Sequence, residues 1–273
     1  MTTLAALVAP LNDIIREAGK AIMEVYEADA AIEVTNKEDD SPVTRADYAA
    51  HHVIVAGLQK LEQQYPILSE EGGLPDFATR SGWQRYWLVD PLDGTKEFIN
   101  RNGEFTVNIA LIDGHRPVLG LVYVPVKNIL YIGVEGEGAW REQNGARTAI
   151  QAKPLVQGGA LRVVGSRRHG AEALDTLLDR VSSQFSQVDL VSMGSSLKIC
   201  ALAEGTADWY PRLALTSEWD TAAAHAVLNA AGGILVDEGL EVLKYNAKEE
   251  LLNPFFHAMG DPSFPWKTLI QQN

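Results

Sequence analysis

The sequence is poor in cysteine and holds no long apolar run. Cys200 is the only cysteine among 273 residues, so no intrachain disulfide can form and a thiolate metal site is disfavoured. No apolar run approaches the roughly 18 residues of a transmembrane helix. The first positive side chain is Arg16, so the basic start of a signal peptide is missing. We therefore expect a cytoplasmic protein without a transmembrane segment.

Positive charge is scarce as well. Lysine and arginine together number 23 against 36 aspartates and glutamates, which gives a formal net charge of −13 at pH 7. A protein that binds nucleic acid polymers needs a basic face, so that class is disfavoured. A small anionic substrate is still compatible, because a local basic pocket or bound cations can reverse the local field.

Several common catalytic motifs are missing. The chain has no G-x-x-x-x-G-K-[ST], H-E-x-x-H, G-x-S-x-G or C-x-x-C, and no G-x-G-x-x-G between a strand and a helix. These absences remove P-loop nucleotide hydrolysis, zinc proteolysis, serine esterase chemistry and a Rossmann cofactor site as leading hypotheses.

The hydrophobic pattern changes character near residue 155. Before that point it predicts two amphipathic helices, Leu4–Tyr26 and Thr44 to about Leu61, against an antiparallel-rich sheet. Beyond it, strands and helices alternate with short links, as is typical of an α/β arrangement. We therefore expect two subdomains, residues 1–155 and 156–273.

The most informative stretch runs from Tyr86 to Thr95. An apolar run, Tyr86 to Val89, predicts a buried strand that stops where Asp90 begins. The chain then turns through Pro91 and reaches Asp93 before a helix that starts near Thr95. Two acids beside a buried strand end carry a desolvation cost that structure alone seldom justifies. A position of this kind suits metal ions and phosphate.

Two more acids stand at the ends of expected elements, namely Glu70 and Asp220. Together with Asp90 and Asp93 they offer the oxygen ligands that Mg²⁺ prefers, and the Leu92 carbonyl could face the same point. Two ions about 4 Å apart, bridged by such acids, would hold phosphate and activate a water for in-line attack.

Each polar feature also has a purely structural interpretation. Asp220 could be the N-cap of the helix that follows it. Asp47 completes a capping box with Thr44. The charged loop 36–42 could be a solvated connector.

Three separated motifs nevertheless resemble the inositol monophosphatase superfamily of lithium-sensitive, Mg²⁺-dependent phosphatases. They are Asp90-Pro-Leu-Asp-Gly-Thr95, the upstream Glu70-Glu71, and the downstream Trp219-Asp220-x-Ala-Ala; Lys37-Glu-Asp39-Asp-Ser-Pro-Val-Thr-x-x-Asp47 agrees with them. Within the superfamily, the segments Trp87–Ile99, Asn102–Leu111 and Gly194–Lys198 are most similar to bacterial 3′(2′),5′-bisphosphate nucleotidases. The resemblance covers nearly the whole chain and implies a layered αβαβα fold with the metal site between two subdomains.

The resemblance also implies roles for individual residues. Its implied metal ligands for two to three Mg²⁺ ions are Glu70, Asp90, the Leu92 carbonyl, Asp93 and Asp220, with Asp47 near a more weakly held ion. Its implied catalytic residues are Asp39 and Thr95, which activate the water, and Glu71, which supports the water shell; Asp40 competes with Asp39 for that role. Its implied substrate contacts are Glu70, Leu92, Asp93, Gly94, Thr95, His169, Ser195, Lys198, Arg212 and Asp220.

By resemblance, the expected reaction is hydrolysis of the 3′-phosphate of adenosine 3′,5′-bisphosphate to AMP, with 3′-phosphoadenylyl sulfate as a second substrate and a role in sulfur assimilation. The alternatives are an inositol or sugar monophosphatase with the same metal core, and a nucleotide or metal sensor without turnover. Lithium inhibition is expected. A homodimer and peripheral attachment to the inner face of the membrane both remain open.

Overall fold

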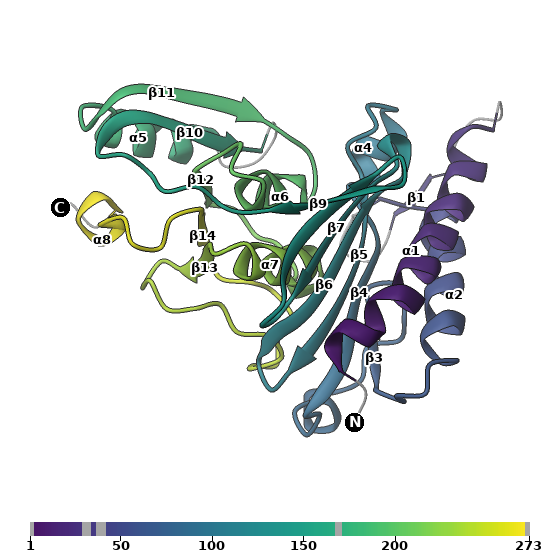
Figure 1. Cartoon of the computed structure of the whole chain (residues 1–273). Coiled ribbons are helices and arrows are strands. Elements are labelled where there is room, and N and C mark those ends of the chain that lie inside the picture. Colours follow the sequence, from purple (N-terminus) through teal and green to yellow (C-terminus); the bar gives the residue numbers. More distant parts are fainter. Residues whose placement is uncertain (1–2, 29–33, 37–41, 167–170, 271–273) are drawn as a thin grey trace.

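The protein consists of five alternating layers of helix and sheet. The computed structural model describes residues 3–28, 34–36, 42–166 and 171–270. In Figure 1, α1 (Leu4–Tyr26) and α2 (Arg45–Leu58) cover one face of a large sheet, and α6 (Leu197–Ala203) and α7 (Glu218–Ala230) lie between that sheet and a smaller one. α5 (Ala171–Ser182) and α8 (Trp266–Ile270) form the outermost layer. The expected αβαβα order is confirmed.

The large sheet has seven strands in the order β3-β4-β5-β6-β7-β8-β9. Their bounds are β3 Ile67–Ser69, β4 Arg85–Asp93, β5 Thr106–Asp113, β6 Arg116–Val124, β7 Ile129–Val134, β8 Gly138–Gln143 and β9 Ala146–Ile150. Neighbouring strands are antiparallel except for the parallel pair β3–β4. Short elements in the same half are β1 Val34–Asn36, β2 Pro42–Thr44, α3 Phe77–Arg80, α4 Thr95–Ile99 and the 3₁₀ turn Pro125–Lys127.

The central strands β4 to β7 of the large sheet are buried on both faces. Successive side chains of a strand point to opposite faces, and β4 shows the result. Trp87 and Val89 enter the core under α1 and α2, whereas Tyr86 and Leu88 enter the core that α7 shares. Such strands are nearly continuously apolar, which explains why the run before Asp90 is so hydrophobic.

Two glycines let α7 lie unusually close to the large sheet. Gly120 of β6 and Gly133 of β7 are direct cross-strand partners. A Cβ at Gly120 would stand 2.2 Å from the carbonyl oxygen of Ala223, and one at Gly133 would stand 2.4 Å from Cα of Val227. Both contacts involve the backbone of α7, so the helix can take this position only against bare glycines.

The smaller sheet has the order β11-β10-β12-β14-β13. Its strands are β10 Gly158–Gly165, β11 Phe185–Ser192, β12 Trp209–Arg212, β13 Ile234–Asp237 and β14 Phe256–Met259. The strands β10, β11 and β12 are parallel, and β14 is antiparallel to both of its neighbours. The predicted subdomain boundary at residue 155 falls between β9 and β10 and stays a prediction.

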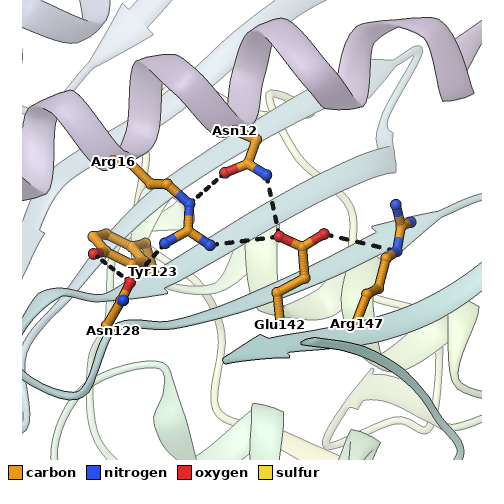
Figure 2. Close-up of polar contacts among 6 residues, drawn as sticks. All are labelled: Asn12, Arg16, Tyr123, Asn128, Glu142 and Arg147. Carbon is orange, nitrogen blue, oxygen red and sulfur yellow. Dashed lines mark hydrogen bonds and ion pairs between the residues drawn. The ribbon is translucent and has the colours of Figure 1, made fainter. Parts of the chain in front are cut away.

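A polar network fastens α1 to the large sheet (Figure 2). Arg16 donates to Asn128 at 2.6 Å and to Asn12 at 2.6 Å, and it forms a 3.4 Å ion pair with Glu142 of β8. Asn12 donates to the same carboxylate at 3.1 Å, and Arg147 of β9 approaches its other oxygen at 3.8 Å. Glu142 therefore ties one helix to two strands.

Some predicted boundaries were wrong. The helix expected to reach Leu61 ends at Leu58. The strand expected to stop at Val89 continues to Asp93. Proline usually ends a strand because it lacks the N–H of the ladder, but Pro91 lies in an irregularity of the pairing where that donor is not required.

Candidate active site

A β-bulge turns Asp90 and Asp93 toward the same side of the large sheet. Asp90 pairs with Asn108 of β5, and Asp93 pairs with Thr106, so β4 advances by three residues where β5 advances by two. In a regular strand, residues three apart point to opposite faces. The extra residue of a bulge removes that difference, and the two acids share a face with Thr106 and Asn108.

Asp47 and Asp220 reach the site from two helix N-termini. Each is the third residue of its helix and completes a capping box, with Thr44 before α2 and Ser217 before α7 as the N-caps. The capping box predicted for Asp47 is confirmed. The interpretation of Asp220 as an N-cap was wrong, because the helix starts two residues earlier, at Glu218.

In Asp47, Asp90, Asp93 and Asp220, one carboxylate oxygen accepts a hydrogen bond from a backbone N–H. The pairs are Thr44 N with Asp47 Oδ2 at 2.8 Å, Leu92 N with Asp90 Oδ1 at 3.0 Å, Ser196 N with Asp93 Oδ2 at 2.6 Å, and Ser217 N with Asp220 Oδ2 at 2.9 Å. Each bond fixes the rotation of a carboxylate and leaves its second oxygen for another partner.

Burial and neighbouring negative charge both act on the acids of the site. Burial raises the pKa of Asp90 well above its ordinary value, and Glu70, Asp93 and Asp220 raise it further. The pKa of Asp220 rises for the same reasons, with Asp93 and Glu70 as its charged neighbours. Within the described residues, no set of three His, Cys, Asp or Glu side chains forms a ready metal cage. The predicted ligand set therefore stays a prediction.

Thr95 contacts Asp47 across the gap between two helices. Its hydroxyl lies 3.2 Å from Asp47 Oδ1 and 3.5 Å from the Leu92 carbonyl oxygen. Burial raises the pKa of Asp47 to about 6, while the bonds from Thr44 oppose that rise. Glu70 and Glu71 are near enough to add to it. Asp47 is thus an acceptor that is still largely ionised at neutral pH.

A pocket lies beside these acids, and side chains of both charges line it. Asp93 and Asp220 contribute carboxylates, and Lys198 and Arg212 contribute cations. Lys198 donates to the carbonyls of Met193 and Ser195 at 3.2 and 2.7 Å, and burial lowers its pKa to about 8. Arg212 donates from Nε and Nη2 to the carbonyls of Ala214 and Leu215.

The structure brings most of the predicted residues together. Those it places around the pocket and the bulge are Glu70, Glu71, Asp47, Asp90, Leu92, Asp93, Gly94, Thr95, Ser195, Lys198, Arg212 and Asp220. Asp39, Asp40 and His169 lie outside the described residues. The helix at Thr95 is only five residues long, so a phosphate there would bond individual N–H groups rather than meet a long helix dipole.

Three buried polar residues near Asp93 were not predicted as part of the site. They are Thr106, Asn108 and Ser196, which are all at most 3% exposed. Two of them could have been found from the sequence. Thr106 and Asn108 occupy the polar face of the alternating segment Glu104–Ile112, which follows the strand that bears the acids.

Comparison with known proteins agrees with this architecture. Residues 4–259 match the family model described as "Inositol monophosphatase family". The chain is 51% identical over 245 residues to the 3′(2′),5′-bisphosphate nucleotidase CysQ of Escherichia coli K12, covering 88% of this chain and 94% of the relative. It is 35% identical to CysQ of Haemophilus influenzae, with 94% of each chain covered.

Solved structures show the same relationship. A crystal structure of CysQ from Bacteroides thetaiotaomicron superposes with a TM-score of 0.81 at 43% identity, over 92% of this chain and 96% of that one. The suhB protein of Bartonella henselae, at 22% identity, shares the fold with a TM-score of 0.76 over 98% of this chain and 99% of that one. The chain belongs to the inositol monophosphatase family.

Proposed function

We propose that the protein is a Mg²⁺-dependent 3′(2′),5′-bisphosphate nucleotidase that converts adenosine 3′,5′-bisphosphate to AMP and phosphate. The observation that carries the proposal is a pocket lined both by the carboxylates Asp93 and Asp220 and by the cations Lys198 and Arg212. Such a pocket suits a substrate with two phosphates, one beside the acids and one beside the cations. The nucleotidase relatives support the same substrate.

The donor set fits a hard divalent cation. Besides burial, Asp93 and Asp220 raise the pKa of Asp90, and Asp93 raises that of Asp220, so positive charge between these acids would offset their repulsion. The N–H bonds described above leave carboxylate oxygens available, and Mg²⁺ prefers oxygen ligands. We propose Glu70, Asp90, the Leu92 carbonyl, Asp93 and Asp220 as ligands of two to three ions, with Asp47 nearby. When bound, Mg²⁺ would neutralise phosphate charge and lower the pKa of water.

Proton removal is assigned to the Thr95–Asp47 pair. In-line attack of water on the 3′-phosphorus forms a P–O bond and breaks the bond to the ribose oxygen; the attacking water gives up a proton, and the departing ribose oxygen takes up a proton to become the 3′-hydroxyl of AMP. Thr95 can accept a proton from water while it passes its own to Asp47, 3.2 Å away. Asp39 and Asp40 remain candidates for the same task, and Glu71 is proposed to order the surrounding water.

The second phosphate is assigned to Lys198 and Arg212. Lysine has three N–H donors and arginine has five, so each can bond a phosphate oxygen without giving up the loop carbonyls it holds. Ser195, Gly94 and His169 complete the proposed contacts. A nucleotide that bears a 5′-phosphosulfate in place of the 5′-phosphate, 3′-phosphoadenylyl sulfate, presents similar charge and is a second proposed substrate, which suggests a cytoplasmic role in sulfur assimilation.

A phosphate-release panel tests the proposal. Purified protein with Mg²⁺ is given adenosine 3′,5′-bisphosphate, 3′-phosphoadenylyl sulfate, inositol 1-phosphate and a sugar phosphate. We expect the highest kcat/KM for the bisphosphate, loss of activity with EDTA, and inhibition by Li⁺. The family match makes an inositol or sugar phosphatase the second candidate, and a higher kcat/KM for inositol 1-phosphate would select it.

Asp93→Asn separates an enzyme from a sensor. The amide keeps the shape of the side chain and removes the charge, so we expect phosphate release to fall at least 100-fold. Nucleotide binding without turnover in the wild-type protein would identify a sensor instead.

Within the described residues, no helix is both long and apolar enough to span a membrane. Gel filtration and vesicle flotation would settle whether the protein is a dimer and whether it attaches to a membrane surface.

A further inference from the structure

Asp93 is held differently from the other acids of the site. The N–H groups that fix Asp47, Asp90 and Asp220 come from residues two or three positions away. The N–H that fixes Asp93 belongs to Ser196, which is 103 residues further along the chain. The orientation of Asp93 therefore depends on how the loop 193–196 docks against the large sheet.

The side chain of Ser196 anchors that loop. Its hydroxyl donates to Asn108 Oδ1 at 3.0 Å and lies 2.8 Å from the hydroxyl of Thr106. Because the Ser196 proton is directed to Asn108, the Thr106 hydroxyl acts as the donor in the second contact. All three side chains are buried, so these bonds are not exchanged for water at low cost.

Other contacts hold the same loop in a conformation that is rare without support. Ser195 has φ +44°, in the left-handed region that non-glycine residues seldom occupy. Gly194 N donates to Glu104 Oε2 at 2.8 Å, and Lys198 bonds the carbonyls on either side of Gly194. Several contacts thus fix the conformation of the loop, and the same loop carries the Ser196 N–H that binds the Asp93 carboxylate.

Asn108 adds a second observation. Its Nδ2 is buried without a hydrogen-bond partner among the described residues. Asn108 is the cross-strand partner of Asp90, so its amide lies beside the acids of the bulge. A buried donor without a hydrogen-bond partner is costly in an ordinary core.

We propose that Ser196, Thr106 and Asn108 are positioning residues of the metal site: they dock the loop 193–196 so that Ser196 N–H holds Oδ2 of Asp93 and Oδ1 is presented to a cation. The inference rests on the proposed role of Asp93 as a metal ligand. Hydrogen bonds to metal-binding carboxylates orient those ligands, and the loss of such a bond typically weakens metal affinity by about 10- to 100-fold. We assign this orienting role to the three side chains.

The test compares Ser196→Ala, which removes the hydroxyl and keeps the backbone N–H, with Thr106→Val, which is nearly isosteric. Mg²⁺ affinity is measured by calorimetry without substrate. We expect both variants to bind Mg²⁺ at least tenfold more weakly than the wild type, with Ser196→Thr restoring most of the affinity. Ser182→Ala is the matched control, because Ser182 is exposed on α5 and its hydroxyl donates to the carbonyl of Asp179, three residues away.

Hydrogen exchange gives a readout that needs no variant. If the docked loop favours Mg²⁺ binding, Mg²⁺ must favour the docked loop by the same factor. We therefore expect Mg²⁺ to slow amide exchange in residues 193–198 of the wild-type protein. Unchanged exchange there, or Mg²⁺ affinities of folded Ser196→Ala and Thr106→Val within twofold of the wild type, would overturn the inference.

The two proposals fail in distinguishable ways. A wild-type protein that binds Mg²⁺ but releases no phosphate from the bisphosphate overturns the proposed substrate and leaves the affinity comparison intact. A wild-type protein that binds no Mg²⁺ overturns both proposals.

Discussion

The hydroxyl of Thr95 donates a 3.2 Å hydrogen bond to Asp47 and so joins the first turns of α4 and α2. If this pair removes the proton of the attacking water, Thr95→Val should lower kcat by at least about 100-fold, the usual contribution of general base catalysis. Substrate affinity and melting temperature should change little, because valine has nearly the same shape. Steady-state kinetics with calorimetric Tm check this, with Thr95→Ser as the variant that retains activity.

Arg212 should discriminate between substrates with one and two phosphates. Arg212→Lys keeps the charge but loses the planar donor geometry. We expect KM for adenosine 3′,5′-bisphosphate to rise about tenfold, as for the loss of one charge-assisted bond of about 1.5 kcal/mol. KM for 3′-AMP, which lacks the second phosphate, should stay within twofold. An equal rise for both nucleotides would place Arg212 outside the second phosphate site.

Buried His225 should make stability depend on pH. Its Nδ1 lies 2.9 Å from the hydroxyl of Tyr245, and burial lowers its pKa from 6.5 to about 3. Between these values the unfolded chain binds a proton that the native protein does not, so the free energy of unfolding falls as pH drops below 6.5. The slope from this residue is about 1.4 kcal/mol per pH unit.

Urea unfolding of the wild type and His225→Asn between pH 7 and pH 5 measures this contribution. His257 has a pKa lowered to about 4 by burial and adds a similar slope. His257→Asn is therefore the comparison, and each single variant should lose a slope of about 1.4 kcal/mol per pH unit relative to the wild type. Burial raises the pKa of Asp47 to about 6 and that of Glu218 to about 7, and these acids give a slope of opposite sign in all three proteins, so the readout is the difference between variant and wild type. A slope of His225→Asn equal to that of the wild type would show that His225 does not stay neutral in the native state.

The glycine pair under α7 yields a prediction about both stability and activity. Gly133→Ala places a methyl group against the backbone of Val227, where no rotamer change can relieve the overlap. We expect a loss of about 1 to 3 kcal/mol, as is usual for overpacking. Activity should fall as well, because α7 carries Asp220. Gly82→Ala, at an exposed turn with room for a methyl group, is the control.

Motifs and hydrophobic periodicity predicted much of this arrangement. The apolar run before Asp90 and the proline and glycine on either side of Asp93 mark a strand and a turn on local grounds, and the layered fold followed from the resemblance. The bulge was not predictable in the same way, because Pro91 normally signals the end of a strand. Its effect depends on pairing with Asn108 and Thr106, which only the register of β5 reveals.

Contacts between segments far apart in the chain could not be predicted from the sequence either. Ser196 is one polar residue in a Gly-Ser-Ser turn, and nothing local distinguishes its contact with Asp93 from solvation. Likewise, Gly120 and Gly133 look like ordinary interruptions of two strands. Their purpose becomes visible only when α7, from the other half of the chain, packs across them.

The N–H groups that hold Asp47, Asp90, Asp93 and Asp220 have a thermodynamic consequence for ligand capture. A free carboxylate side chain loses rotamer freedom when it coordinates an ion, and that loss opposes binding. Here the rotation of each of the four side chains is already arrested in the folded chain. The entropy of ordering the site is therefore lost during folding, and little of it remains to be lost at each round of association.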